Sequence, residues 1–201
     1  ESFDEKGNSI YNQKGELVCT QAFPSMPIYF WNDDNNKKYN NAYFDTFKGI
    51  WNHGDYISIS ESGSVKIFGR SDTTLNPGGV RIGTAEIYQT VERFEEIEDS
   101  LVIGQPWHND ERIILFVKMK AGINISNQLI QKIQSSIQQS CSPRHVPKKI
   151  ISIKDIPYTI NGKKVELAVK HIIQNIEVKN KDSLANPEVL DYYEGIIELN
   201  T

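Results

Sequence analysis

The pattern of apolar residues changes near residue 70, and this change limits the folds open to the chain. Before it, short apolar runs separated by turn residues predict strands, the last two joined by a hairpin turn, at 15–20, 25–31, 55–60 and 64–69. After it, helical spacing alternates with the pattern of buried strands. The sequence therefore predicts an α+β chain in which a β-rich part precedes a small α+β domain.

The second part is predicted to hold a three-stranded sheet with helices. Thr84 and Ser126 are each the expected N-cap of a helix, followed by apolar residues at helical spacing as far as Phe94 and Ile137. The strands are expected at 99–105, 112–119 and 148–153. A third helix is expected to carry Leu167, Ala168, Ile172 and Ile173. A polar spacer from 179 then leads to a short terminal helix capped by Asn186 and opened by Pro187. We expect the domain boundary between 1–71 and 72–201.

Composition excludes several classes of protein. In 201 residues, 38% hydrophobic and 24% charged residues are typical of a folded globular chain. The net charge of -4 predicts no general attraction to nucleic acid or to an acidic membrane, and no apolar run approaches the roughly 20 residues of a membrane span. Cys19 and Cys141 show no metal-ligand spacing and predict no metal site but a reducing, cytoplasmic compartment. The start at Glu1 and the few strands before residue 70 predict a piece of a longer chain.

Charged residues gather around the transition between the two parts. Asp55 precedes a predicted strand, Arg70 and Asp72 follow the next one, and Arg81 follows the glycines at 78 and 79. These charges could simply pair with one another at the hairpin ends. Alternatively, a carboxylate could accept the two hydroxyls of a ribose, and an arginine could donate to ribose or phosphate oxygens. Gly78 and Gly79 would allow the backbone to approach a ligand closely.

A second candidate feature is the turn in "IPYTINGKK", residues 156–164. Asn161-Gly162 predicts a two-residue hairpin loop that projects Lys163 away from the domain. Lys163 could be an ordinary solvated lysine. A lysine on a rigid turn is also suited to meet the negative charge that develops on a phosphoryl group.

Taken together, these motifs resemble a known family. "HGDY" (53–56), "GRSDTTLNPGGVRIGTAEIY" (69–88) and "IPYTINGKK" are similar to the closing motifs of the adenylate-forming acyl-CoA synthetases, in the same order. Within that superfamily, "AFPSMPIYFWND" (22–33) and "SLANPEVLDYY" (183–193) resemble the acetoacetyl-CoA synthetases. The likeness covers essentially the whole chain.

The resemblance implies a reaction in two steps. ATP and acetoacetate would give acetoacetyl-adenylate and pyrophosphate, with Mg2+ as cofactor, and CoA would then give the thioester and AMP. The residues before the hinge would be the β-rich C-terminal piece of the large ATP-binding domain, and the rest would be a mobile lid domain. The missing N-terminal part of the same chain would hold the phosphate-binding loop and the acid pocket, so the fragment alone would be inactive.

The resemblance also implies a role for each matching residue. Asp55 and Arg70 would contact the nucleotide ribose, Arg81 would contact phosphate, and Lys163 would bridge the substrate carboxylate and the α-phosphate. Asp72 would be the hinge. The face that carries Gly78 and Gly79 would line the CoA channel in the second step.

The sequence departs from the family pattern at three places. Thr73 stands where many relatives carry a second acid, and the turn before Lys163 lacks their arginine. Gln138 occupies the place of an arginine used near CoA, with Arg144 nearby. Two alternatives therefore stay open. One is another adenylating enzyme, such as an acetyl-CoA synthetase or a peptide-synthetase adenylation module. The other is a non-catalytic binding domain that keeps the fold.

Overall fold

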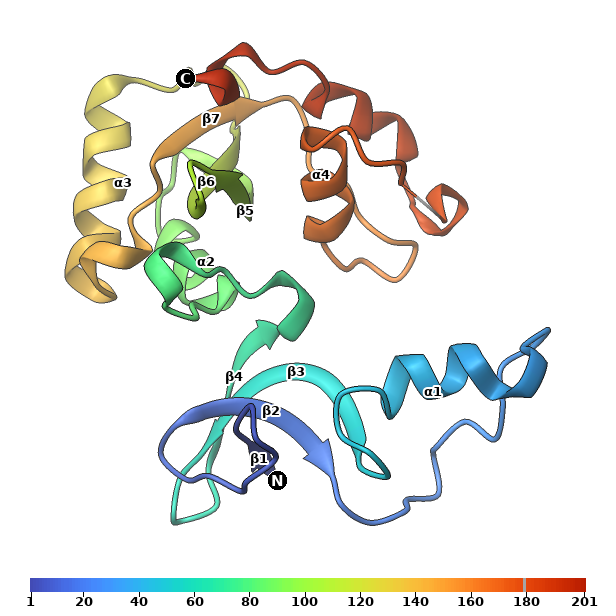
Figure 1. Ribbon diagram of the computed structural model, residues 1–201. Coiled ribbons are helices and arrows are strands. Elements are labelled where there is room, and N and C mark those ends of the chain that lie inside the picture. Colours follow the sequence, from blue (N-terminus) through green and yellow to red (C-terminus); the bar gives the residue numbers. More distant parts are fainter. Residues whose placement is uncertain (179) are drawn as a thin grey trace. The chain divides into compact units, whose positions relative to one another are not determined.

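The computed structural model describes residues 1–178 and 180–201, and this part of the chain divides into two compact units (Figure 1). The first unit is Glu1–Asp72 and the second is Thr73–Thr201. The predicted α+β class, with a three-stranded sheet and helices in the second part, is confirmed.

An antiparallel sheet with strand order β1-β2-β3-β4 forms the first unit. Its strands are β1 (Ser2–Phe3), β2 (Lys14–Cys19), β3 (Trp51–Ile59) and β4 (Val65–Arg70). Residues 60–64 connect β3 and β4, and Gly63 adopts a φ of +84° in this turn. The predicted hairpin is therefore present, although β3 begins four residues earlier than expected.

The strand predicted at 25–31 is wrong, since these residues form turns and irregular backbone. Pro24 and Pro27 lack the N–H that a strand ladder requires. The side chains that suggested a buried strand face solvent, because Ile28 is 90% exposed and Trp31 is 88% exposed.

The first unit also contains a helix that the sequence pattern did not predict. Helix α1 (Lys37–Tyr43) has a polar sequence and no buried residue. It contacts β3 through Tyr43, whose ring stacks on Trp51 with 3.7 Å between ring centroids. An aromatic contact between distant residues thus holds a helix that local apolar periodicity does not reveal.

The second unit contains three strands in the order β5-β6-β7. β5 (Ile97–Trp107) pairs antiparallel with β6 (Asp110–Met119), which pairs parallel with β7 (Lys149–Ile153). The helices are α2 (Thr84–Val91), α3 (Asn127–Ser140) and α4 (Glu166–Ile173). β5 is an edge strand in this sheet, and its outer edge is important for the site described below.

Helices cover both faces of this sheet. Val102 and Leu115 belong to a buried cluster with residues of α2 and α3, whereas Leu101 and Phe116 belong to a second cluster with residues of α4. Figure 1 shows α3 and α4 on opposite sides of the strands. Since successive strand residues point to opposite faces, a strand with two covered faces is a continuous apolar run.

The predicted helix ends are partly correct. Ser126 caps α3, because its hydroxyl oxygen accepts a hydrogen bond from the Leu129 N–H at 3.2 Å. Thr84 is the first helical residue rather than the cap, which is Gly83. The terminal helix Pro187–Tyr193 is a 3-10 helix. Lys179, the first residue of the predicted spacer, lies outside the described residues. No helix among the described residues is long and apolar enough to cross a membrane.

Candidate functional site

Asp55 and Arg70 lie opposite each other on β3 and β4. Arg70 Nη1 is 3.8 Å from Asp55 Oδ1, and Arg70 Nη2 is 3.4 Å from Asp72 Oδ2. His53, the first residue of the "HGDY" motif, was not predicted as a site residue, but its Nε2 is 3.7 Å from the second carboxylate oxygen of Asp55. The Arg70 side chain is 54% exposed, so these ion pairs add little to stability and can be exchanged for a ligand at low cost.

Gly54 creates the space for this arrangement. A Cβ at Gly54 would be 2.9 Å from Arg70 Nη2, and the φ of Gly54 is +79°. The guanidinium group thus lies directly against the backbone of β3 and donates to the His53 carbonyl oxygen at 3.4 Å. The geometry is compatible with mutual pairing of these charges, because Arg70 pairs with Asp55 and Asp72. It is also compatible with ligand binding, because the three side chains are partly exposed.

The second candidate feature is the glycine loop, residues 76–81. Its ends are joined by two hydrogen bonds between the backbones of Leu75 and Ile82, at 2.9 and 2.8 Å. Within the loop, Gly78 and Gly79 have φ values of +59° and +75°, which non-glycine residues rarely adopt. The pair of glycines is therefore required by the loop conformation itself.

Acidic residues on β6 hold the glycine loop. The Gly78 N–H donates to Asp110 Oδ1 at 2.8 Å, and the Asn76 N–H donates to Glu111 Oε1 at 2.7 Å. Hydrogen bonds from the backbone of Glu111 and Gly78 hold the pKa of Asp110 below its usual value. Arg144 donates to the Gly78 carbonyl oxygen at 3.3 Å.

Lys163 lies on a hairpin, but the loop has three residues rather than the predicted two. The Thr159 N–H donates to the Lys163 carbonyl oxygen, and the Gly162 N–H donates to the Thr159 carbonyl oxygen, both at 2.8 Å. Gly162 has a φ of +72°, which corresponds to a tight turn closed by a glycine bulge. The Lys163 side chain is exposed, and its ammonium group has no hydrogen-bond or ion-pair partner within the described residues.

The first stem of the Lys163 hairpin, residues 158–160, is also hydrogen-bonded to residues 183–185 on the edge that faces away from Lys163. The Ile160 N–H donates to the Ser183 carbonyl oxygen at 3.0 Å, and the Ala185 N–H donates to the Tyr158 carbonyl oxygen at 2.8 Å. The exposed Lys163 therefore follows a stem whose backbone is hydrogen-bonded on both edges.

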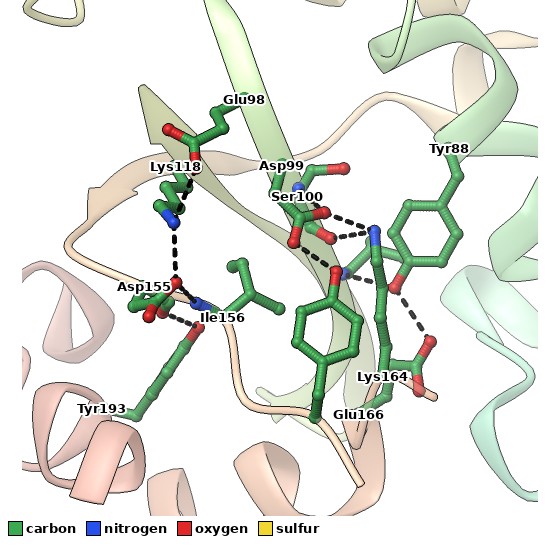
Figure 2. A network of polar contacts seen from close by, with 12 residues as sticks. Tyr88, Glu98, Asp99, Ser100, Lys118, Asp155, Ile156, Lys164, Glu166 and Tyr193 are labelled. Carbon is green, nitrogen blue, oxygen red and sulfur yellow. Dashed lines mark hydrogen bonds and ion pairs between the residues drawn. The ribbon is translucent and has the colours of Figure 1, made fainter. Parts of the chain in front are cut away.

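The residue after Lys163 belongs to a polar network beside β5 (Figure 2). Lys164 Nζ is 2.8 Å from Asp99 Oδ1 and donates to the Ser100 carbonyl oxygen at 2.6 Å. Asp99 also accepts a hydrogen bond from the Tyr158 hydroxyl. Burial, followed by this hydrogen bond with Asp99, raises the pKa of Tyr158.

Tyr88 of α2 reaches the same edge of β5. Its hydroxyl donates to Glu166 Oε1 at 2.9 Å and accepts from the Val102 N–H at 3.0 Å. Burial and the nearby Glu166 raise the pKa of Tyr88 well above its ordinary value. Tyr88 of α2 and Lys164, two residues before α4, thus satisfy backbone groups of a strand edge that would otherwise be open.

The predicted residues form three separate groups in the structure. Asp55, Arg70 and Asp72 contact one another in the first unit, Arg81 belongs to the glycine loop of the second unit, and Lys163 lies on the hairpin of the second unit. Gln138, which occupies the place of the family's arginine near CoA, is an exposed residue of α3. Arg144, the nearby arginine, contacts the glycine loop. No three acidic, histidine or cysteine side chains come together to hold a metal ion within 1–178 and 180–201.

Comparison with known proteins gives the class first. A benzoate CoA ligase from Burkholderia xenovorans has a similar fold, with a TM-score of 0.69 over 85% of this chain and 33% of that chain, at 21% identity. An anthranilate CoA ligase matches with the same TM-score and identity over 81% of this chain and 31% of that one. The fold is that of adenylate-forming CoA ligases. No family model matches the chain.

More similar relatives identify the particular family. Acetoacetyl-CoA synthetase from Streptomyces lividans is 41% identical, with a TM-score of 0.91 over 100% of this chain and 30% of that chain. The curated relative from Rhizobium meliloti is 51% identical over 199 residues, 99% of this chain and 31% of its own length. By sequence, the chain belongs to the acetoacetyl-CoA synthetase family, as its motifs predict. It spans about 30% of the length of these relatives.

Proposed function

We propose that these residues form the lid, the hinge and one edge of the nucleotide site of an acetoacetyl-CoA synthetase. In the first step, a carboxylate oxygen of acetoacetate attacks the α-phosphorus of ATP, and the bond to the β-phosphate breaks to release pyrophosphate. In the second step, the CoA sulfur attacks the acyl carbon of the adenylate, AMP leaves, and the thiol proton passes to solvent.

Lys163 is proposed to act in the first step. The observation that carries this proposal is its exposed ammonium group on a hairpin whose first stem is hydrogen-bonded on both edges. Negative charge on the phosphate oxygens must be met during transfer, and a cation delivered at that moment stabilises the transition state more than the ground state. A rigid turn is suited to this task because little further ordering is needed when the lid closes.

The glycine loop is proposed to act in the second step. Gly78 and Gly79 present backbone without side chains, so the pantetheine arm of CoA can pass close to it. The two hydrogen bonds that the loop amides donate to Asp110 and Glu111 fix the loop to β6, which favours a preformed binding surface. Asp72 is proposed as the hinge, a position supported by the unit boundary directly after it.

The remaining predicted residues are proposed to bind nucleotide. Asp55 would accept the ribose hydroxyls, Arg70 would donate to the ribose, and Arg81 would donate to a phosphate oxygen. The half-exposed ion pairs around Arg70 are consistent with exchange for a ligand. Mg2+ would arrive with the ATP phosphates, whose negative charge it would offset. The free thiols of Cys19 and Cys141 support a reducing, cytoplasmic location.

Separate measurement of the two half-reactions tests the proposal in a full-length enzyme that carries these residues. Lys163→Ala should lower acetoacetate-dependent exchange of pyrophosphate into ATP by about 100-fold or more, as expected for loss of a transition-state charge contact. It should change thioester formation from supplied acetoacetyl-adenylate by less than about twofold. Lys132→Ala, at an exposed lysine of α3, is the matched control.

The same assay separates the alternatives. Equal rates with acetate and acetoacetate would favour a broader acyl-CoA synthetase. Absence of exchange with any short acid, in protein that still binds ATP, would favour a non-catalytic domain. Equal loss of both half-reactions in Lys163→Ala would contradict the role assigned to this lysine.

A further inference from the structure

Lys163 and Lys164 are adjacent in sequence but lie in opposite environments. Lys163 is exposed, whereas the side chain of Lys164 is 20% exposed and reaches the edge of β5. Lys164 pairs with Tyr158 in an antiparallel bridge, and successive residues of such extended backbone point in opposite directions. Fixing the Lys164 side chain inward therefore directs the Lys163 side chain outward.

We infer that Lys164 is a positioning residue, which orients Lys163 through its contacts with Asp99 and the Ser100 carbonyl group. This inference rests on the proposed function of Lys163 in adenylate formation. It assigns to the second lysine of the Asn-Gly-Lys-Lys turn a role in the same half-reaction, without contact to substrate.

The contacts of Lys164 come from three directions. Its ammonium group meets the Asp99 carboxylate, the Ser100 carbonyl oxygen and the face of the Tyr88 ring, whose centroid is 4.4 Å away. A carboxylate, a carbonyl and an aromatic face together leave the ammonium group few alternative positions. The Lys164 side chain is therefore more restricted than that of a fully exposed lysine, which can adopt many rotamers.

Asp99 connects the two strands of the hairpin. One carboxylate oxygen pairs with Lys164 on the strand that follows the loop, and the other accepts from the Tyr158 hydroxyl on the strand that precedes it. Figure 2 shows Asp99 and Ser100 of β5 facing Lys164. A single carboxylate on the sheet therefore holds both stems of the loop that carries Lys163.

The start of α4 is tied to the same place. Glu166, in the first turn of α4, accepts from the Tyr88 hydroxyl, and that hydroxyl in turn accepts from the Val102 N–H of β5. The Lys163 loop is thus anchored at Asp99 and Ser100 of β5, and α4 is anchored through Tyr88 at Val102 of the same strand edge. A change at Lys164 should affect the direction of the Lys163 side chain more than the fold of the unit.

The experiment measures both half-reactions of the full-length enzyme for Lys164→Met, Lys164→Arg and Lys163→Ala. Lys164→Met keeps the length of the side chain but removes its charge. It should lower acetoacetate-dependent pyrophosphate exchange between about 10- and 100-fold, the range expected when a reacting group is misplaced by about 1 Å. Thioester formation from supplied adenylate should change by less than about twofold. Lys164→Arg, which can still pair with Asp99, should recover part of the exchange rate.

Lys118→Met is the matched control. Lys118 pairs with Glu98 at 2.7 Å and with Asp155 at 3.0 Å, in a separate branch of the network in Figure 2. Its removal deletes an ion pair of similar geometry without touching the hairpin loop, so the ratio of the two half-reactions should stay unchanged. If Lys118→Met changes this ratio as Lys164→Met does, the inference is overturned.

A second measurement keeps the inference testable if Lys164→Met folds poorly. In Asp99→Asn, hydrogen exchange of the Gly162 and Lys163 amides should be faster by about tenfold, because local opening becomes less costly by about 1.4 kcal/mol. Unchanged exchange at these amides overturns the inference. Normal adenylation in Lys163→Ala would instead refute the proposed function, whereas loss in Lys163→Ala with no loss in Lys164→Met would refute only the positioning role.

Discussion

Glu111 lies directly over Gly104 of the neighbouring strand, so close that a Cβ on Gly104 would overlap the Glu111 carboxyl group. The two residues are diagonal neighbours across the β5–β6 pair, since Gly104 is opposite Ile113 and Glu111 is opposite Pro106. The absence of a side chain at Gly104 therefore determines where the Glu111 carboxylate lies.

That position matters because the Glu111 carboxylate serves two other elements. One oxygen accepts from the Asn76 N–H of the glycine loop, and the other pairs with Lys170 of α4 at 2.9 Å. We predict that Gly104→Ala displaces the carboxylate and loosens both contacts. The expected loss of stability is about 1–3 kcal/mol, as for other overpacked sites.

Urea unfolding of Gly104→Ala measures this loss, and Gly122→Ala is a useful comparison. A Cβ at Gly122 would meet nothing within 4 Å, although its φ of +78° still requires some strain. A loss well below about 1 kcal/mol for Gly104→Ala would contradict the role given to its contact with Glu111.

The two glycines of the glycine loop should differ in how they tolerate alanine. At Gly79 a Cβ would meet no atom within 4 Å, so Gly79→Ala should cost only the backbone strain of its positive φ, about 1–2 kcal/mol. At Gly78 the Cβ would also lie 2.7 Å from Arg144 Nη1. Gly78→Ala should therefore displace Arg144 and cost more than Gly79→Ala in thermal unfolding.

A double variant isolates the contribution of the contact. With Arg144→Ala already in place, the further cost of Gly78→Ala should fall to that of Gly79→Ala, because only strain remains. An unchanged difference between the two glycines would mean that the Arg144 contact does not determine the cost.

Local sequence patterns were sufficient to predict most strands and helices of the second unit. Continuous apolar runs predicted β5, β6 and β7, and the cap of α3 at Ser126 follows from the residue alone. The strand predicted at 25–31 was wrong because its apolar residues were given more weight than Pro24 and Pro27, which lack ladder donors. Ile28 and Trp31, which contributed to that prediction, are exposed in this chain.

The missed parts of the site depend on contacts between distant residues. Asp110 and Glu111 support the glycine loop across more than 30 positions, and Asp99 meets Lys164 across 65. Motif spacing predicts which residues would contact substrate, but it does not indicate the acidic residues that hold their loops. The roles of Asp55, Arg70, Asp72, Arg81 and Lys163 stay predictions that the experiments above address.

Tyr88 should make the second unit less stable in alkaline solution. Burial raises the pKa of its phenol well above 10.0, so the folded state favours the protonated form. The stabilisation is complete below pH 10 and is lost at higher pH, where the unfolded chain releases this proton and the folded chain does not. The slope approaches about 1.4 kcal/mol per pH unit for one such group.

Urea unfolding between pH 9 and 11 measures this dependence, with tyrosinate absorbance as a second signal. Tyr88→Phe should be less stable than the parent at pH 9, because it removes the acceptor of the Val102 N–H and one hydrogen bond to Glu166, but its stability should fall less steeply with pH. Equal slopes for the parent and Tyr88→Phe would contradict the prediction.

The two adjacent lysines should differ in their reactivity toward acylating reagents. Lys163 is exposed, whereas Lys164 must leave the Asp99 carboxylate and the Ser100 carbonyl oxygen before its amine can react. With limiting acetic anhydride, we expect modification of Lys163 to exceed that of Lys164 by at least about tenfold, a preference that requires only about 1.4 kcal/mol. Mass spectrometry of the peptide containing both lysines measures the ratio. In Asp99→Asn the ratio should decrease, and in urea-unfolded protein it should approach one. Equal labelling of Lys163 and Lys164 in the folded parent would contradict the environments described.

Because acetylation removes the charge of Lys163, adenylate formation should fall in proportion to its modification.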